Sequence, residues 1–502
     1  MDKNEQHTII RRSLEYSKSI AKSQPYKIQF IALEKYFKKN RIKINRHNKY
    51  IFFKGFSKKN YSSSVYIRDF LFKNDYMTPR QAILLTPNAY IFYTVQTFKL
   101  VFLLLKRDKK NIVHLNTRKE VSFSLEKTQI FYAGILQYSK FNTNNASYKK
   151  SYNYFKKRLS KFKGSQVLKV DIQDFFLGIT TTRLKKELMD LNFSTSKSDN
   201  LTQEITMVIN SIINFFEQSG YTSLPQSQGS IASSVLSQLY LSKFTYALNN
   251  YCVCHGLTVV RYVDDMYIDL PKEFDEKSIP DLLNLISTEL WKLGLSVNSK
   301  KIAIIDMPQF KKLINDTLEA SYADVTQIKT NKSIQEKTNS LLNNNGYDLL
   351  EFMKECARII DDKGYSPLEY KNIFNHYFSI ENDDANKVLN NLLFSNGINS
   401  LSLKATQQLL KYVNIIPFDP HAFTVLFIKL ETRIRKVGNY EYYVVEDFLR
   451  KELTTPPYTV RKALIETTYY TQNKEFILND KGAKLQELNK IFREYILHYI
   501  DK

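Results

Sequence analysis

Apolar and polar residues follow two different patterns along this chain, and the change falls near residue 310. Between residues 167 and 306, short β-branched runs separate longer segments whose apolar residues recur at helical spacing. In order, this pattern predicts a strand, a helix, two strands, a helix and a strand. That order is typical of a split βαβ, ferredoxin-like unit, with helices on one face of the sheet and the other face free.

From about residue 310 onwards the pattern is helical. Apolar residues recur every three or four positions in five segments, which we expect to form an all-α region resembling an α-solenoid. The sequence shows no repeat signature that would establish a solenoid. The five segments are LLEFMKECARIID, ANKVLNNLLF, LKATQQLLKYV, AFTVLFIKLETRIRKV and LQELNKIFREYILHYI.

The segment RYVDDMYIDL, residues 261–270, has strand character but carries two adjacent carboxylates, Asp264 and Asp265. If the strand is continuous, these side chains point to opposite faces of the sheet. If the chain turns at the acidic pair, it returns as a second strand, and aspartate tolerates turn geometry well. Taken alone, the pair is most simply interpreted as solvated charges at a hairpin tip.

Asp171 changes that interpretation, because it ends the first strand of the predicted unit, beside the central hairpin. We therefore expect Asp171 and Asp264 to face each other across neighbouring strand ends, with Asp265 close by. Crowded carboxylates raise one another's pKa unless a cation is present. Hard divalent ions suit such a site, so the three aspartates predict binding of Mg²⁺, or alternatively Mn²⁺. Two such ions can activate a hydroxyl nucleophile and stabilise leaving pyrophosphate, which is nucleotidyl transfer.

The net charge of +23 is concentrated in the first third of the chain. Residues 1–164 hold 35 Lys and Arg against 9 Asp and Glu, whereas residues 165–502 hold 38 against 41. Tyr and Phe are interleaved with the basic residues, as in SYKKSYNYFKKRLSKFKG. A solvated basic face, a membrane surface or an acidic protein partner could explain the charge alone. The interleaved aromatic residues favour nucleic acid, since rings stack on bases while cations attract phosphates.

The three cysteines, Cys252, Cys254 and Cys356, are too few for a disulfide framework in 502 residues. Cys252 and Cys254 precede His255 but lack the second ligand pair of a structural zinc site, so we interpret them as reduced strand cysteines. Reduced thiols predict a cytoplasmic protein. We find no apolar signal segment and no stretch as long as a membrane span, and we expect VFLLL at 101–105 to be buried.

Four motifs resemble the palm motifs of reverse transcriptases in order and spacing. They are VDIQDFF, QGS followed by a helix containing LYL, YVDD and GLSVNSKK. YVDD is the most diagnostic, since RNA-templated viral replicases usually carry Gly before the acidic pair. The resemblance implies an α+β fold, in which reverse-transcriptase fingers and a ferredoxin-like palm precede an all-α, HEAT-like domain. The expected domains are a basic N-terminal fingers region (1–165), a palm (166–309) and a helical C-terminal domain (310–502).

The resemblance also implies catalytic roles. Asp171 and Asp264 match the principal metal ligands, and Asp265 matches a carboxylate that binds metal less directly or supports the hairpin. Lys301 matches a lysine that protonates the departing pyrophosphate as a general acid, with Lys300 as its rival.

Further residues match the family's nucleotide-binding positions. A ring at Phe176 would clash with a ribose 2′-hydroxyl, so we expect deoxynucleotides to be preferred, although Phe175 or Phe176 could equally be a core residue. Tyr262 opens the YVDD motif. The loop that packs against the incoming nucleotide corresponds to Gln228, Gly229 and Ser230.

The chain also departs from the common pattern. Two additional residues separate LPQ from GS, Ser234 and Gln238 stand where Pro and Asn are usual, and neither a primer-grip motif nor a compact thumb follows Ile305. In its basic N-terminal region, its palm, its long helical C-terminal region in place of a thumb and its chain length, the chain resembles the abortive-infection, AbiK-like branch of bacterial reverse transcriptases.

The AbiK-like resemblance implies untemplated, protein-primed DNA synthesis from deoxynucleoside triphosphates. The first nucleotide would be joined to a tyrosine hydroxyl, which leaves single-stranded DNA attached to a homo-oligomer that defends against phage, without a membrane partner. The 34 tyrosines leave the priming residue open. The alternative is an RNA-templated reverse transcriptase of the retron or intron type. An inert nucleic-acid-binding scaffold or a helical-repeat interaction protein would not explain the ordered aspartates.

Overall fold

A computed structural model gives the fold of most of the chain. Contacts between residues divide the chain into two compact units, the first with Met1–Arg68 and Ala82–Ser321, the second with Asp69–Gln81 and Tyr322–Lys502. The division into three domains stays a prediction. The structure describes residues 3–23, 28–39, 66–72, 79–107, 113–137, 148–193, 200–226, 230–312, 314, 332–380, 385–438, 443–451 and 495.

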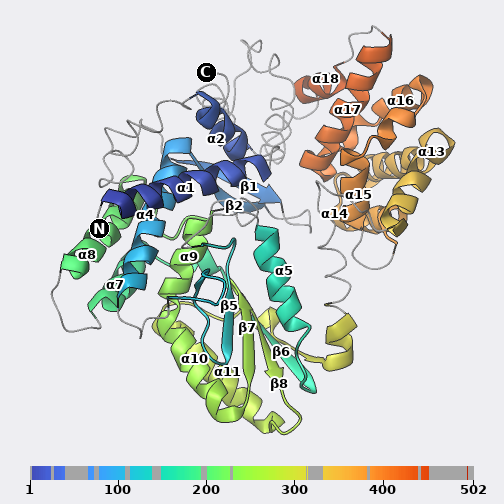
Figure 1. The fold of residues 1–502 in the computed structure, drawn as a ribbon. Helices are drawn as coiled ribbons and strands as arrows, with labels where there is room; N and C mark the ends of the chain where they lie inside the picture. Colours follow the sequence, from blue (N-terminus) through green and yellow to red (C-terminus); the bar gives the residue numbers. More distant parts are fainter. Residues whose placement is uncertain are drawn as a thin grey trace. The chain divides into compact units, whose positions relative to one another are not determined.

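A five-stranded sheet forms the centre of the first unit, in the order β5-β7-β8-β6-β9 (Figure 1). The four strands β6 to β9 pair antiparallel in the order of a split βαβ unit, which confirms the predicted topology. We did not anticipate β5, which pairs parallel with β7, because its four residues are too few to give a strand pattern. The strands are β5 (Thr128–Phe131), β6 (Gln166–Asp171), β7 (Thr258–Tyr262), β8 (Asp265–Leu270) and β9 (Ala303–Asp306).

Helices cover one face of this sheet, as predicted. Leu168 and Val170 of β6 and Ile268 of β8 are buried in one core together with residues of α9, α10 and α11. Leu168 and Val170 are two positions apart in β6, and Leu168 pairs directly with Ile268 of β8, as expected for side chains that share one face. The helices of the first unit are α1 (Lys3–Ser23), α2 (Ile28–Lys39), α4 (Pro87–Lys106), α5 (Tyr148–Leu159), α6 (Phe175–Gly178), α7 (Thr181–Phe193), α8 (Asn200–Gln218), α9 (Ile231–Tyr240), α10 (Ser242–His255) and α11 (Ile279–Lys292).

The opposite face is also covered, so the prediction of a free face is wrong. Val167 of β6 and Val260 of β7 point to this side and are fully buried. Phe155 of α5 and Phe310, which follows β9, pack in the same cluster. Alternate strand positions on this face are apolar, and burying them against an aromatic helix removes that apolar area from water.

The helix α4 is the described helix whose length and composition could allow it to cross a membrane. Its 20 residues include the VFLLL segment, and 83% of its most apolar window is buried inside the fold. Thr86 caps its start by accepting a hydrogen bond from the Ala89 N–H. The expectation that no stretch reaches the length of a membrane span is therefore wrong for this helix. The expected burial of residues 101–105 is confirmed for most of the segment.

The cysteines predicted in a strand lie in a helix instead. Cys252 and Cys254 belong to the last turn of α10, which ends at Gly256 in a left-handed conformation, with φ of +68°. The run CVC has strand propensity, but the helix that begins at Ser242 continues through it, and tertiary packing overrides weak local preference. Cys252 and Cys356 are buried, and burial raises the pKa of the Cys252 thiol to about 12.

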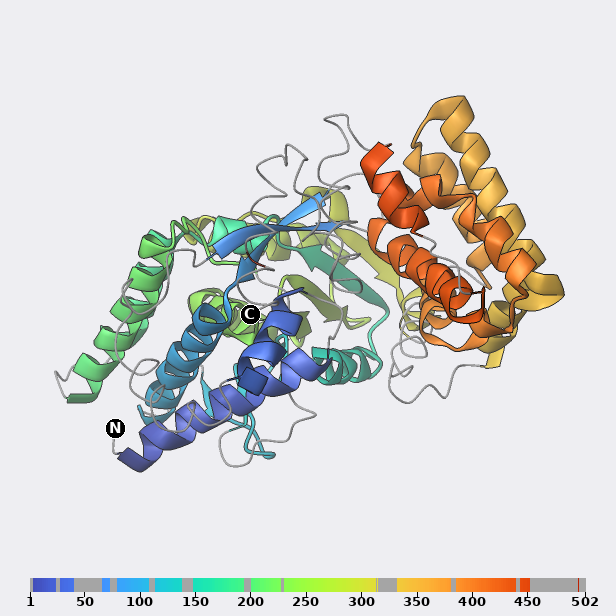
Figure 2. The same ribbon diagram turned by 90° about the horizontal axis from the view of Figure 1, so that it is seen from above.

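The described part of the second unit is helical from α13 to α18, which confirms the predicted α+β fold with an all-α C-terminal region (Figure 2). Non-helical backbone at Asn343–Gly346 breaks α13 in two. The last predicted segment, LQELNKIFREYILHYI, lies outside the described residues except for Tyr495, and HEAT-like repeats stay a prediction. The helices are α13 (Lys332–Lys363), α14 (Pro367–Phe378), α15 (Ala385–Phe394), α16 (Leu403–Leu410), α17 (Pro420–Gly438) and α18 (Val444–Lys451).

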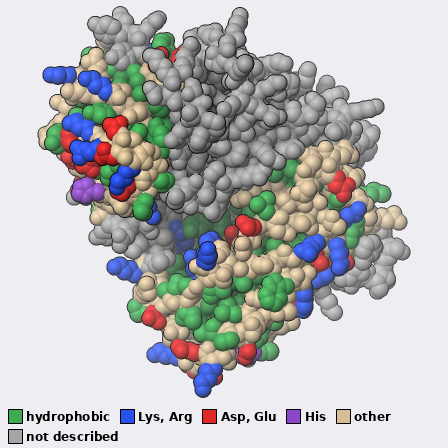
Figure 3. Space-filling model, turned by 180° about the vertical axis from the view of Figure 1, so that it is seen from behind, with side chains coloured by type: hydrophobic (Ala, Val, Ile, Leu, Met, Phe, Trp, Pro, Cys, Tyr) green, Lys and Arg blue, Asp and Glu red, His purple; other side chains and the backbone are tan. Residues whose placement is uncertain are grey.

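Two further sheets of two strands each complete the described strands. β1 (Tyr66–Phe72) pairs with β2 (Pro79–Leu85), and β3 (His114–Leu115) pairs with β4 (Val121–Ser122). On the face drawn in Figure 3, Lys and Arg side chains of the described residues occur together with Asp and Glu rather than in one separate patch.

Candidate active site

The acidic pair lies at a tight turn between β7 and β8. Tyr262 pairs with Asp265 across the hairpin, which leaves Val263 and Asp264 as its two turn residues. The prediction of a strand, a turn at the acids and a second strand is therefore confirmed. Val263 has a φ of +56°, a conformation that is costly for a β-branched residue. It is held there by a hydrogen bond from its N–H to the Phe131 carbonyl (3.2 Å) and by burial of its side chain.

This backbone strain predicts an unusual order of stability at position 263. We expect Val263→Gly to unfold at a higher urea concentration than Val263→Ala, by about 1 kcal/mol in free energy of unfolding, because left-handed backbone penalises any Cβ. Both variants lose the buried valine side chain, so the comparison isolates the backbone contribution. A more stable Ala variant would show that the turn is not strained.

Asp171 ends β6 directly opposite Asp265 in the sheet register. Its side chain is 4% exposed. Lys301 Nζ donates to both carboxylate oxygens of Asp171 at 3.0 Å, and Asn298 Nδ2 donates to Oδ2 at 3.2 Å. The Asn298 N–H also donates to the Asp171 carbonyl (2.7 Å). These contacts hold the fourth motif, GLSVNSKK, against the end of β6.

Asp264 lies within electrostatic reach of the other charged groups. The pKa of Asp264 is raised to about 6, mainly by burial and also by the charges of Asp265 and Asp171, whereas Lys301 acts to lower it. The Ile172 N–H donates to the Asp264 carbonyl across the strand ends (3.4 Å). Three aspartates and one lysine from three separate segments therefore interact at the hairpin.

The chemistry of these donors fits a magnesium site with two protein carboxylates. Mg²⁺ is usually held by one or two carboxylates and by substrate phosphates. Asp171 and Asp264 are suited to this role, since Asp171 is buried and Asp264 is half buried, with the pKa of its carboxyl raised mainly by burial. Among the described residues, no three His, Cys, Asp or Glu side chains are grouped closely enough to hold a metal ion. A site with three protein ligands therefore stays a prediction.

The ion pair between Lys301 and Asp171 distinguishes Lys301 from its rival. Lys301 is half exposed, so its ammonium can leave Asp171 and reach another anion. We expect Lys301→Met to lower the rate of nucleotide incorporation about a hundredfold, the order typical of a lost general acid. Lys300→Met is the matched control and should change the rate less than about twofold. Equal effects of the two substitutions, measured under single-turnover conditions, would exclude the assigned role.

The predicted nucleotide-binding residues are only partly described. Phe175 is a core residue, whereas Phe176 is half buried, with ring centroids 5.2 Å apart. Ser230, directly before α9, is buried, and its hydroxyl makes no hydrogen bond to a described residue. Gln228 and Gly229 lie outside the described residues, so their contacts with a nucleotide stay a prediction.

Tyr262 contacts an aromatic helix that the sequence analysis did not assign to the site. Its ring lies 5.0 Å from the Tyr152 ring, edge to face, and 5.4 Å from that of Phe155, both on α5. The run SYKKSYNYFKKRLSKFKG was recognised as basic and aromatic. Its place against the hairpin depends on tertiary packing, which that run alone does not encode.

A buried arginine supports the hairpin from the helical side of the sheet. Arg261 is 1% exposed, and its Nη2 donates to Gln238 Oε1 (2.8 Å) and to Thr245 Oγ1 (3.3 Å). Burial lowers the pKa of its guanidinium to about 9. Gln238 is one of the departures noted in the sequence, and this contact gives it a structural role. In the sequence, the only indication of this support is that a basic residue, Arg261, directly precedes the YVDD motif.

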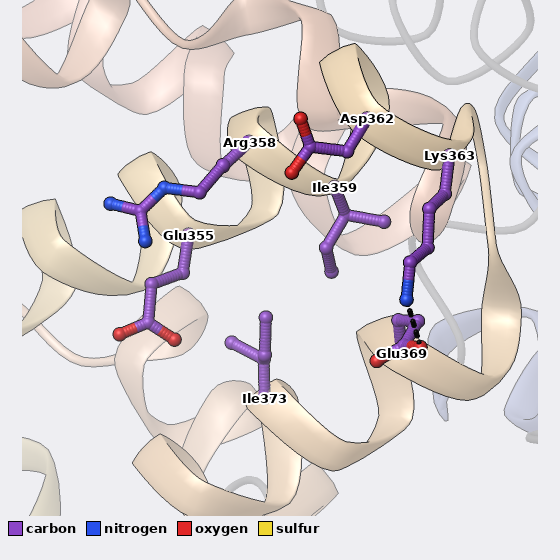
Figure 4. Close-up of a pocket in the computed structure, with 7 residues that line it drawn as sticks. All are labelled: Glu355, Arg358, Ile359, Asp362, Lys363, Glu369 and Ile373. Atoms are coloured by element: carbon purple, nitrogen blue, oxygen red, sulfur yellow. Dashed lines mark hydrogen bonds and ion pairs between the residues drawn. The ribbon is translucent and has the colours of Figure 1, made fainter.

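A pocket of about 140 Å³ in the second unit contains none of these residues (Figure 4). It lies between α13 and α14, where Lys363 Nζ binds Glu369 Oε1 (2.7 Å). Glu355, at its edge, accepts a hydrogen bond from the Tyr377 hydroxyl (2.8 Å). The pocket is lined by both acidic and basic side chains, some of which pair with each other, so its lining indicates no particular ligand.

Comparison with known families agrees with this geometry. Residues 135–315 match the reverse transcriptase (RNA-dependent DNA polymerase) family. This reverse-transcriptase segment contains β6 to β9 and all three aspartates, which confirms the resemblance at the level of that family. The AbiK-like branch stays a prediction. A comparison with curated proteins gave no match.

Among solved structures, a telomerase from Candida albicans in complex with a fragment of telomeric RNA is similar to this chain. The likeness covers 89% of this chain with 12% sequence identity and a TM-score of 0.30. This chain spans 66% of the length of that telomerase. A TM-score this low supports no functional conclusion.

Proposed function

We propose that this protein is a metal-dependent nucleotidyltransferase of the reverse-transcriptase type, which polymerises deoxynucleoside triphosphates into DNA. The observation that carries the proposal is the position of Asp171 opposite Asp265 in the sheet register, beside Asp264 at the strained turn between β7 and β8, within the reverse-transcriptase segment. Strained backbone and perturbed carboxyl groups are typical of active sites.

The residues of the site then take distinct roles. Asp171 and Asp264 hold Mg²⁺, or Mn²⁺, which supplies Lewis-acid stabilisation of charge on the phosphates. Lys301 releases Asp171 when substrate binds and donates a proton to the departing pyrophosphate. Asn298 keeps hold of Asp171 through its side chain and its backbone N–H, so the carboxylate stays oriented. The half-buried ring of Phe176 opposes a ribose 2′-hydroxyl and selects deoxynucleotides.

The finer proposal is synthesis without a template, primed by a tyrosine of the protein, in a cytoplasmic homo-oligomer that aborts phage infection. Its support is the helical region where a compact thumb would follow the palm, together with the missing primer-grip motif after Ile305. RNA-templated synthesis is the second candidate, favoured by the description of the matched family as RNA-dependent DNA polymerase.

Incubation with Mg²⁺ and labelled deoxynucleotides, with and without added RNA template and primer, separates these candidates. Products are run on denaturing protein gels before and after protease treatment. Label that migrates with the polypeptide without template supports protein-primed synthesis. Strict dependence on template and primer supports the second candidate. If neither Mg²⁺ nor Mn²⁺ gives incorporation under either condition, the proposed enzyme is wrong.

A further inference from the structure

The helix α5 and the turn after it form an unusually basic segment. Residues 148–164 contain seven Lys and Arg and no Asp or Glu. Where the structure describes these side chains, Lys157, Lys161 and Lys163 are exposed and Arg158 is half buried. Such a run attracts the phosphate backbone of a nucleic acid through the release of condensed counterions.

This segment is fixed beside the catalytic hairpin. The apolar side of α5 buries Phe155 and Leu159 against the sheet, and Tyr152 contacts Tyr262 of the hairpin. Tyr262 in turn pairs with Asp265. A strand bound along α5 therefore leads directly to the carboxylates.

Two tyrosines of α5 add ring surfaces to this basic helix. Lys156 Nζ lies 4.4 Å from the centre of the Tyr152 ring, and Arg118 lies 5.0 Å from that of Tyr154. Both rings are half buried, so each keeps part of its surface exposed. Cations that follow a backbone and rings on which bases stack are the two features that bind single strands without sequence preference.

The covered sheet favours a single strand over a duplex. The broad face that could have received a duplex is occupied by α5 and by the cluster around Met307 and Phe310. A single strand needs only a narrow track of cations and rings, which one helix can provide.

We infer that α5, with the turn as far as Gly164, binds the backbone of single-stranded nucleic acid that enters or leaves the catalytic hairpin. The inference rests on the proposed function, because it takes the bound strand to be a substrate or product of the polymerase. Binding can nevertheless be measured without nucleotides, so a failure of α5 to bind can be distinguished from a failure of the polymerase activity.

The test measures binding of a fluorescent 20-nucleotide oligo(dT) to the full chain by anisotropy at several salt concentrations. In the variant with Lys157, Arg158, Lys161 and Lys163 all replaced by Gln, we expect the Kd to rise at least about tenfold. The slope of log Kd against log salt should fall by about 0.7 for each phosphate that the variant no longer neutralises. The matched control replaces four exposed lysines elsewhere in the first unit with Gln and should leave both quantities unchanged. These control residues are Lys185, Lys186, Lys272 and Lys277.

A second variant separates stacking from charge. Tyr154→Ala should weaken oligo(dT) binding about fivefold or more while the salt slope stays the same. Unchanged affinity in the four-residue variant, or tighter binding of a 20-base-pair duplex than of the single strand by the wild-type chain, would overturn the inference. If the wild type and the variants bind oligo(dT) as expected but no nucleotide is incorporated, the binding role of α5 is supported and the proposed polymerase activity is wrong.

Discussion

Replacing Asp264 with Asn is expected to lower deoxynucleotide incorporation at least about a thousandfold and to stabilise the metal-free fold. The loss of rate follows because a metal ion supplies several kcal/mol of transition-state stabilisation, and each 1.36 kcal/mol is a factor of ten. Incorporation is measured with saturating Mg²⁺ and deoxynucleotides. Asp174→Asn is the matched control, since Asp174 is exposed and has a φ of +43°, which Asn tolerates, so its incorporation should be unchanged.

The stabilisation depends on pH in a defined direction. The pKa of Asp264 is raised from 3.8 to about 6 in the folded protein, so ionisation destabilises the fold. Relative to the unfolded chain, stability falls as pH rises from about 4 to about 6, and the full cost applies above pH 6. The difference of about two pKa units sets an upper limit of about 3 kcal/mol.

Urea unfolding with EDTA tests this pH dependence. Because the amide in Asp264→Asn cannot ionise, the variant should exceed wild type in free energy of unfolding at pH 8 and differ from it least near pH 4. An equal difference at both values would show that Asp264 is not desolvated in the folded protein.

Replacing Asp171 with Asn should lower incorporation as much as Asp264→Asn does. Unlike Asp264→Asn, it should destabilise the metal-free fold. The Asp171 carboxylate accepts hydrogen bonds from Lys301 and Asn298 and is almost fully buried. Removing its charge weakens these contacts and costs about 1.5–3 kcal/mol, the range for hydrogen bonds to charged groups.

The same substitution, Asp to Asn, is therefore expected to have opposite effects on stability at the two positions. Urea unfolding of Asp171→Asn and Asp264→Asn with EDTA at pH 8 should show the first less stable than wild type and the second more stable. If both are destabilised alike, the electrostatic description of the site is wrong. If either retains incorporation, the corresponding carboxylate is not needed for the chemistry.

The sequence was sufficient to predict the parts of the fold that depend on local pattern and motif order. The alternation before Asp171 and around Asp264 predicted the strands, and the order of the elements predicted the antiparallel sheet. The motif order singled out both Asp171 and Lys301 as site residues, and the structure brings them into contact although 130 residues separate them. Short-range pattern and a shared topology were enough for these features.

The features that the sequence analysis missed depend on tertiary contacts. The packing of α5 on the second sheet face depends on where Val167 and Val260 point, which becomes clear only once the strand register is known. The helical state of Cys252 depends on a helix that begins ten residues earlier, at Ser242. The contacts by which Asn298 orients Asp171 depend on the distance between the end of β6 and the segment after α11, which no local pattern supplies.

The most direct test of the metal-dependent site is a crystal structure of the protein with Mn²⁺ and a non-hydrolysable deoxynucleoside triphosphate. Anomalous scattering locates the manganese directly. We expect at least one Mn²⁺ bound to the carboxylates of both Asp171 and Asp264, about 2.1 Å from the nearest oxygen of each, with the Lys301 ammonium turned from Asp171 towards the triphosphate. Nucleotide and manganese bound elsewhere, with the pair of Lys301 and Asp171 intact, would contradict the account.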